Sequence, residues 1–188
     1  MRLILIIWLC VHFSKSINLK LDVEDNEEYD LATIERLHQN CLQSERAIEY
    51  FYSRNITMPS IKQFKLGYSD KQDMVIVPVY DQYNKCMGFV ARSIEGKSFK
   101  NSPGMKKSKT FFNLSNCKFS DVVVVESSFD AIRLNQLGYN GIASLGAGIS
   151  RFQIELLEKY AKSIIVIPDN DDAGKEMLSK INENIYSK

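Results

Sequence analysis

The 188-residue chain has a hydrophobic content of 45% and a net charge of +1 at pH 7. That apolar content is enough to bury a core in one domain or in two small ones. A charge so close to zero excludes a global basic field, so any nucleic-acid partner would have to be held by a local basic patch. The four cysteines, Cys10, Cys41, Cys86 and Cys117, form no CxxC pair. Their spacing indicates reduced thiols and predicts no zinc site in this chain.

The N-terminal segment, residues 1–30, joins an apolar run to an acidic linker. Residues 3–13 are apolar, one arginine precedes them, and the small residues Ser14 and Ser16 follow. This pattern is typical of a secretory signal peptide, and the run is too short to span a bilayer. The alternatives are an apolar helix packed on the body and an upstream remnant from a misplaced start. Residues 18–30 are polar and acidic, which predicts a linker.

The next part of the chain alternates between helical and strand patterns. Apolar residues recur near helical spacing over residues 31–52 and predict one or two amphipathic helices. Pro59 favours the start of a short helix over residues 60–64. Residues 74–80 and 86–94 predict two strands of a hairpin. Because Pro78 has no N–H to donate, its strand should have an edge or a bulge there.

A basic segment follows this hairpin. It carries six basic residues against one acidic residue, a local charge of +5, with phenylalanines interleaved. The basic residues are Arg92, Lys97, Lys100, Lys106, Lys107 and Lys109. Basic side chains can contact phosphates while aromatic rings stack on bases, so the segment predicts a face that binds nucleic acid. A solvated loop is the alternative.

The last third of the chain has the pattern of a parallel sheet. Four consecutive valines, residues 122–125, are typical of a strand buried on both faces. The elements expected after this strand are a helix (129–137), a strand (141–145), a glycine-rich turn (146–148), a helix (151–160), a strand (163–168) and a helix (173–185). Strands and helices alternating at this spacing predict a βαβαβα unit.

Acidic residues follow the first and third of these strands. Glu126 comes directly after the first strand, and Asp169 and Asp171 follow the third. Parallel strands bring their carboxyl ends to one edge, where ligands bind, and Asp130 lies one helical turn beyond Glu126. Carboxylates so close raise one another's pKa unless a cation lies among them. Oxygen ligands without His or Cys predict Mg²⁺ or Mn²⁺, although Asp and Asn are also ordinary turn and N-cap residues.

The stretches ESSFDAIRL, SLGAG and DNDDAG together resemble the Toprim domain, whose signature is a Glu after the first strand and a DxD after the third. The upstream stretch, with its strand, GFVAR, NSP and basic-aromatic run, is similar to the segment before Toprim in DnaG-type bacterial and phage primases. The resemblance covers residues 31–188. It implies an α/β fold in which a smaller α+β primase-core subdomain (31–118) precedes a C-terminally short Toprim domain (119–188), a parallel sheet flanked by helices.

The resemblance also implies roles for individual residues. Glu126, Asp169 and Asp171 match the family's catalytic, metal-binding carboxylates, and Asp130 matches its further conserved acid. Arg92 matches the arginine of the GxxxR element. Lys107 lies where the family has a basic residue near nucleotide and template. Ser127 departs from the pattern, because the family usually has glycine after the glutamate.

The function implied by the resemblance is template-directed synthesis of RNA primers on single-stranded DNA, with Mg²⁺ or Mn²⁺ as cofactor. The expected partners are a single-stranded DNA template, ribonucleoside triphosphates, a replicative helicase and a separate zinc-binding domain that acts in trans. The alternatives are a catalytically silent or split Toprim module that binds DNA or replication partners, and a Toprim nuclease. Template and nucleotides are cytoplasmic, so we expect the N-terminal segment not to act as a secretion signal.

Overall fold

The computed structural model describes residues 30–96, 98–146 and 148–186. These residues form two compact units that divide between Lys106 and Lys107. They are named here the N-terminal unit (30–106) and the C-terminal unit (107–186). The sequence predicts a boundary after residue 118. Residues 107–118 nevertheless belong to the C-terminal unit, because Phe111, Leu114 and Cys117 are buried in its core. The signal-like segment lies outside the described residues.

The N-terminal unit begins with three helices, α1 (Leu31–Gln43), α2 (Glu45–Ser53) and α3 (Met58–Gln63). Asp30, which the sequence assigns to the linker, is the N-cap of α1: its carboxylate accepts from the N–H groups of Ala32 and Thr33 at 3.0 and 3.2 Å. Ser44 caps α2 in the same way. Both predictions of helices in this region are confirmed, and Pro59 lies in the first turn of α3.

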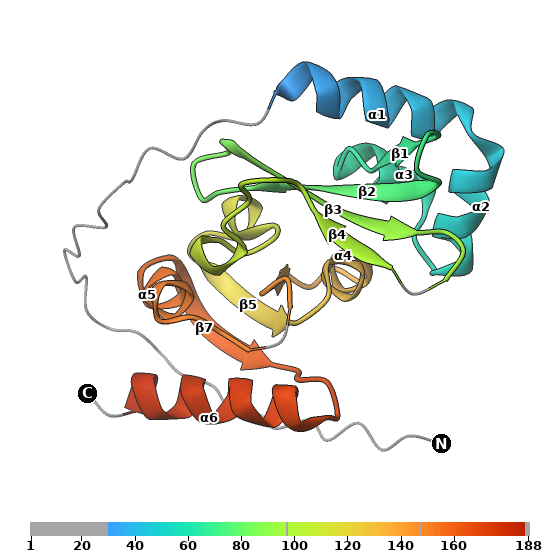
Figure 1. Cartoon of the computed structure of the whole chain (residues 1–188). Coiled ribbons are helices and arrows are strands. Elements are labelled where there is room, and N and C mark those ends of the chain that lie inside the picture. The colour runs from blue at the N-terminus through green and yellow to red at the C-terminus, as the bar shows by residue number, and fades with distance from the viewer. Residues whose placement is uncertain (1–29, 97, 147, 187–188) are drawn as a thin grey trace. The chain divides into compact units, whose positions relative to one another are not determined.

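An antiparallel sheet completes this unit, and α1 lies along it (Figure 1). Its strands run in the order β1 (Gly67–Ser69), β2 (Met74–Tyr80), β3 (Cys86–Ser93) and β4 (Phe99–Asn101). The predicted hairpin is β2 and β3. Because β1 pairs only with the first three residues of β2, Pro78 has no partner on that side, and the register shifts directly after Val79. The predicted edge at Pro78 is therefore present, and the irregularity in the β2–β3 pairing comes after the next residue, between Val79 and Tyr80.

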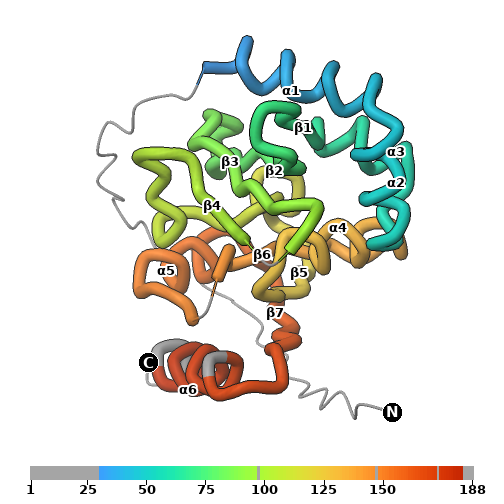
Figure 2. The backbone as a smooth tube through the Cα atoms, turned by 45° about the vertical axis from the view of Figure 1, so that its right-hand side comes forward, coloured from blue at the N-terminus to red at the C-terminus, as the bar shows by residue number. Residues whose placement is uncertain are grey.

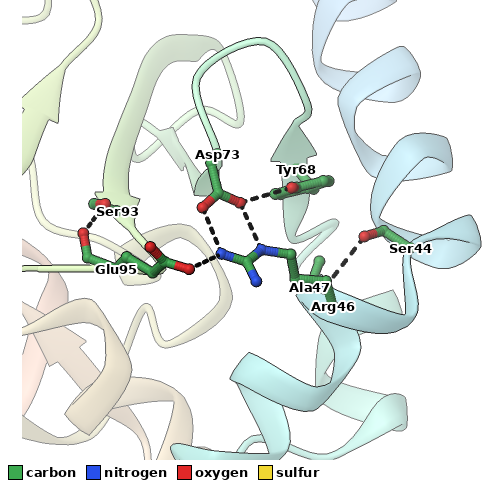
Figure 3. A network of polar contacts seen from close by, with 7 residues as sticks. All are labelled: Ser44, Arg46, Ala47, Tyr68, Asp73, Ser93 and Glu95. Atoms are coloured by element: carbon green, nitrogen blue, oxygen red, sulfur yellow. Dashed lines mark hydrogen bonds and ion pairs between the residues drawn. The ribbon is translucent and has the colours of Figure 1, made fainter.

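Arg46 of α2 joins segments of the N-terminal unit that are far apart in the sequence (Figure 3). Its guanidinium donates to the two carboxylate oxygens of Asp73 at 2.9 and 2.8 Å and to Glu95 at 2.6 Å. The Tyr68 hydroxyl donates to Asp73 at 2.8 Å. These hydrogen bonds, that of Arg46 first, lower the pKa of Asp73 to about 2. The network ties α2 to the turn before β2 and to the residues after β3.

Acid should weaken this unit through Asp73, and Arg46→Gln should remove much of that dependence. A carboxyl whose folded pKa of about 2 lies below the ordinary 3.8 stabilises the fold above its unfolded pKa, and the contribution disappears as pH falls toward 2. The side chains are 48% and 36% exposed, so solvent screens the pair and we expect the loss of stability in the variant to be small. Urea unfolding at about pH 5 and about pH 2 should show the gap between wild type and variant closing. An equal gap at both pH values would contradict the assignment.

The C-terminal unit is built on three parallel strands in the order β6-β5-β7 (Figure 2). Its elements are η1 (Lys107–Lys109), η2 (Leu114–Asn116), β5 (Ser120–Val125), α4 (Ser128–Gln136), β6 (Gly141–Ala143), α5 (Arg151–Tyr160), β7 (Ala161–Val166) and α6 (Asp172–Tyr186). The chain moves from β5 to β6 and then crosses back to β7. Right-handed crossovers in opposite directions place α4 and α5 on opposite faces of the sheet.

The core of this unit follows from that topology. Val122 and Val124 belong to one buried cluster with side chains of α5 and α6, including Leu157 and Met177. The alternate valines of β5 point to the other face, where α4 packs against β5 and β6. The predicted fold class, a parallel sheet flanked by helices and preceded by an α+β subdomain, is confirmed. No helix within the described ranges has the length and apolar character that crossing a membrane requires.

Candidate functional site

The strand order of the C-terminal unit places two acidic residues side by side. In an open α/β sheet, ligands bind beyond the carboxyl ends of the strands, at the point where the strand order reverses. Here that point lies between β5 and β7, which pair directly. Glu126 follows β5 immediately, and Asp169 follows β7 after Ile167 and Pro168. The structure therefore brings together residues that are far apart in the sequence.

Glu126 is held at this edge with little freedom. It is 8% exposed, and its Oε1 accepts a long hydrogen bond of 3.4 Å from the N–H of Asp169. Burial raises the pKa of Glu126 above its usual value. The Asp169 N–H acts in the opposite direction, and the negative charges of Asp169 and Asp171 raise the pKa further. The buried carboxylate is thus placed among groups of its own charge.

Asp169 and Asp171 lie at the solvent-facing side of the same edge. Burial is the largest cause of a raised pKa at Asp169, followed by the charges of Asp130 and Asp171. Asp171 also has a local role, because its Oδ1 accepts from the N–H of Gly174 at 2.9 Å at the start of α6. The N-cap interpretation of this aspartate is therefore correct as far as one of its oxygens is concerned.

Gly174 allows α6 to begin against the backbone of Asp169. A Cβ at residue 174 would lie 3.0 Å from both the carbonyl carbon and the nitrogen of Asp169, and closer still to its carbonyl oxygen. Backbone atoms cannot give way as a flexible side chain can, so only glycine fits without displacement. The sequence shows a glycine entering the helix, but the contact that requires it appears only in three dimensions.

Asp130, on the first turn of α4, is paired with Arg133 of the same helix. It nevertheless lies close enough to raise the pKa of Asp169. Its side chain is 36% exposed. Asp130 thus lies at the periphery of this cluster of carboxylates, and its charge is partly neutralised by Arg133.

These four acidic residues fit a hard divalent cation by their chemistry. Carboxylate oxygens without His or Cys suit Mg²⁺ or Mn²⁺. Across the described ranges, no ion pair involves Glu126, Asp169 or Asp171, so their mutual repulsion has no lysine or arginine to offset it. Their side chains do not converge into a ready-made cage: within these ranges no group of three His, Cys, Asp or Glu is close enough to enclose a metal.

The basic residues predicted to bind nucleic acid are divided between the two units. Arg92 on β3, Lys100 on β4 and the exposed Lys106 belong to the N-terminal unit, whereas Lys107 and Lys109 form η1 of the C-terminal unit. Lys97 lies outside the described residues. The Arg92 guanidinium stacks on the exposed ring of Phe99, 4.7 Å from its centroid. A cation stacked on a ring offers both a phosphate contact and an aromatic edge.

Lys107 lies at a cavity of about 230 Å³ in the C-terminal unit. Gly146, Gly148, Ser150 and Gln153 also line it, and Lys180 reaches it from α6. Sequence reasoning missed Ser150 and Gln153. The available signal was the S-x-x-Q spacing of a helix capping box directly after the glycine-rich turn.

The three described cysteines form no disulfide. Cys41, Cys86 and Cys117 are all buried. Burial raises the pKa of Cys41 to about 12 and that of Cys117 to about 11. These two thiols therefore stay protonated at neutral pH, and a protonated thiol is a poor metal ligand.

Comparison with known proteins gives matches for both units. Residues 123–188 match a family model described as Toprim-like. The DNA primase of Clostridium acetobutylicum is 33% identical over 125 residues, which covers 61% of this chain and 21% of that protein. The DNA primase of Synechococcus elongatus is 36% identical over 128 residues, covering 61% of this chain and 18% of that protein. The chain thus spans about a fifth of the length of these relatives.

A solved structure shares the fold. The structure of the DnaG primase catalytic domain bound to ssDNA superposes with a TM-score of 0.70 at 21% sequence identity, over 81% of this chain and 65% of that one. At this level of identity the match concerns the arrangement of helices and strands.

Proposed function

The chain carries a Toprim domain of the DnaG-primase type, and from that premise we propose that it acts in template-directed synthesis of RNA primers on single-stranded DNA. The observation that supports this most is the placement of Glu126 and Asp169 at the carboxyl ends of adjacent parallel strands. Each has a raised pKa, and neither forms an ion pair with a described residue. Neighbouring carboxylates of this kind are stabilised by a bound divalent cation.

In this proposal Glu126, Asp169 and Asp171 hold Mg²⁺ or Mn²⁺, with Asp130 at the border. A divalent ion bound there would supply charge stabilisation for in-line attack of a 3′-hydroxyl on a nucleoside triphosphate. The protein's part is to fix the ligands. Glu126 is held by the end of a buried strand, and Asp171 is oriented by its hydrogen bond to the Gly174 N–H.

The basic residues would bind the polyanionic substrates. We assign phosphate contacts to Arg92, Lys100, Lys106, Lys107 and Lys109, and the same role to Lys97 from its sequence position. The match to a catalytic domain bound to ssDNA supports a single-stranded template as partner. A replicative helicase, a separate zinc-binding domain and a cytoplasmic setting complete the proposal as expectations from the DNA primase relatives.

Primer synthesis is tested directly by incubating the chain with single-stranded DNA, the four ribonucleotides and Mn²⁺. We expect short RNA products that depend on both the template and the metal, and more product when a zinc-binding domain of a related primase is added. Degradation of the DNA without RNA synthesis would replace the proposal with the nuclease alternative. Binding of DNA and metal with neither reaction would support the catalytically silent module.

The salt dependence of DNA binding should identify the basic segment. Replacing Lys106, Lys107 and Lys109 with alanine removes up to three phosphate contacts. The slope of log K against log salt should become shallower by up to ~2, at about 0.7 per contact on a single strand. The matched control is Lys62, Lys71 and Lys162, which are exposed and carry the same charge. An equal change in both triple variants would show that only net charge matters, and no change in the first would place binding elsewhere.

A further inference from the structure

Gln153 of α5 is a buried amide with an unusual number of partners. Its residue is 2% exposed. The side-chain Oε1 of Gln153 accepts from the backbone N–H of Ser150 at 3.0 Å, and the backbone N–H of Gln153 donates to the Ser150 hydroxyl at 3.0 Å. This reciprocal pair is a capping box that closes the start of α5. The helix cap uses the amide oxygen, which leaves the amide nitrogen for other partners.

The nitrogen is directed at three backbone carbonyls. Gln153 Nε2 donates to the carbonyl of Thr110 at 2.8 Å, of Ser144 at 3.1 Å and of Lys107 at 3.3 Å. Two hydrogens are therefore shared among three acceptors. The Ser150 hydroxyl adds a second connection by donating to the carbonyl of Ser108 at 2.5 Å. Two side chains at the start of α5 thus fix the backbone of η1 to the end of β6.

The segment that is fixed in this way carries Lys107. A Cβ built on Gly146 would lie 2.7 Å from Lys107 Nζ, so the ammonium group rests directly against the glycine backbone. Gly146 follows β6, and the preceding residue, Leu145, donates its N–H to the backbone carbonyl of Glu126 at 3.1 Å. Lys107 therefore points into its cavity at the same edge of the sheet that carries Glu126.

We propose that Gln153 is a positioning residue, which fixes the backbone of Lys107 so that the ammonium group meets a phosphate group of the nucleotide in this cavity. The inference rests on the proposed function, which assigns Lys107 to a phosphate contact. A lysine has a long flexible stem, and fixing its backbone reduces the ordering that binding otherwise requires. A glutamine that served the helix alone would need only its oxygen.

A double-mutant cycle on binding of inorganic pyrophosphate, followed by calorimetry without metal, tests this role. We expect Lys107→Ala to weaken binding about tenfold, the loss of one charge-assisted hydrogen bond. Gln153→Met should weaken it about threefold or more in the wild-type background and should add nothing once Lys107 is alanine, because both act through one group. Ser150→Ala, which removes the second connection to η1, should show the same dependence on Lys107 and provides the cycle if Gln153→Met does not fold.

The matched control is Asn135→Ala. Asn135 of α4 is a partly buried amide whose nitrogen donates to the carbonyls of Ala131 and Gly141, neither of which belongs to η1. Its loss should lower the thermal midpoint and leave pyrophosphate affinity unchanged. The inference is overturned if wild type does not bind pyrophosphate, if Lys107→Ala leaves the affinity unchanged, or if Gln153→Met has the same effect in both backgrounds. The expected pattern in a protein that makes no RNA would remove the proposed function and keep the phosphate site.

Discussion

Glu126→Gln should make no detectable RNA primers and bind Mn²⁺ at least about tenfold more weakly, while folding at least as stably as wild type. Tenfold is the lower end of what changes even to outer-shell partners of metal ligands cost. The catalytic loss should be on the order of 100-fold or more, since charge stabilisation at the reacting phosphate is removed. Glutamine keeps the size of the side chain and the oxygen that accepts from the Asp169 N–H.

The expectation that Glu126→Gln folds at least as stably as wild type follows from the sign of the pKa shift of Glu126. Burial and neighbouring negative charges raise the pKa of Glu126, so the ionised carboxylate is less favourable in the folded chain than in the unfolded one. A neutral side chain relieves that cost at neutral pH. Functional groups that oppose stability are typical of binding sites.

Calorimetric Mn²⁺ titration, urea unfolding and the primer assay together measure the result. Asp169→Asn and Asp171→Asn are companion variants, both expected to weaken Mn²⁺ binding without unfolding the chain. If Glu126→Gln bound Mn²⁺ as tightly as wild type, the carboxylate group would not be the metal site. If it lost stability, its role would be structural.

Gly174→Ala should lower the free energy of unfolding by about 1–3 kcal/mol, the usual cost of overpacking, and weaken Mn²⁺ binding at least about tenfold. Helix propensity alone predicts the opposite sign, because alanine is favoured over glycine within a helix by about 1 kcal/mol. The added methyl group would collide with the backbone of Asp169, so α6 or Asp169 must move.

Gly141→Ala is the matched control for this variant. A Cβ at Gly141 would lie 2.6 Å from the carbonyl oxygen of Ala131 and 2.8 Å from Leu134 Cβ, a backbone collision of the same kind. Gly141 begins β6, pairs with Val123 of β5, and is separated by β5 from the strand that leads to Asp169. It should therefore lose stability and keep its Mn²⁺ affinity. Equal losses of affinity in both variants would show that general destabilisation, and not the position of Asp169, governs the metal site.

The elements that position the carboxylates could be predicted because their signals are local. The valine run marks β5, and the residue after it, Glu126, is fixed at the strand end by the alternation of strand and helix. The helix predicted over residues 151–160 has those bounds in the structure, since a capping serine precedes it. The assignment to a Toprim domain, made from three short motifs, and to the DnaG type, made from the stretch upstream of them, is confirmed.

The features that could not be predicted depend on contacts between distant residues. Strands β1 and β4 have three residues each, too few for a period of two to be recognised. Arg46 and Asp73 are polar residues on separate elements, and their pairing appears only when α2 packs beside the turn. Gln153 resembles a surface residue of an amphipathic helix until its three carbonyl partners are seen. The roles proposed for the carboxylates and lysines remain predictions.

The raised pKa values at the carboxyl edge link the stability of the C-terminal unit to its ligand. Folding brings Glu126 and Asp169 together despite their repulsion, and this repulsion opposes part of the stabilisation that core packing provides. A divalent cation would relieve the repulsion on binding, and the stabilisation of the folded state by the cation would grow as RT ln(1 + [L]/Kd). Any protons that these carboxyls carry would be released in the same event. Metal occupancy, proton release and resistance to unfolding would then all report on one equilibrium.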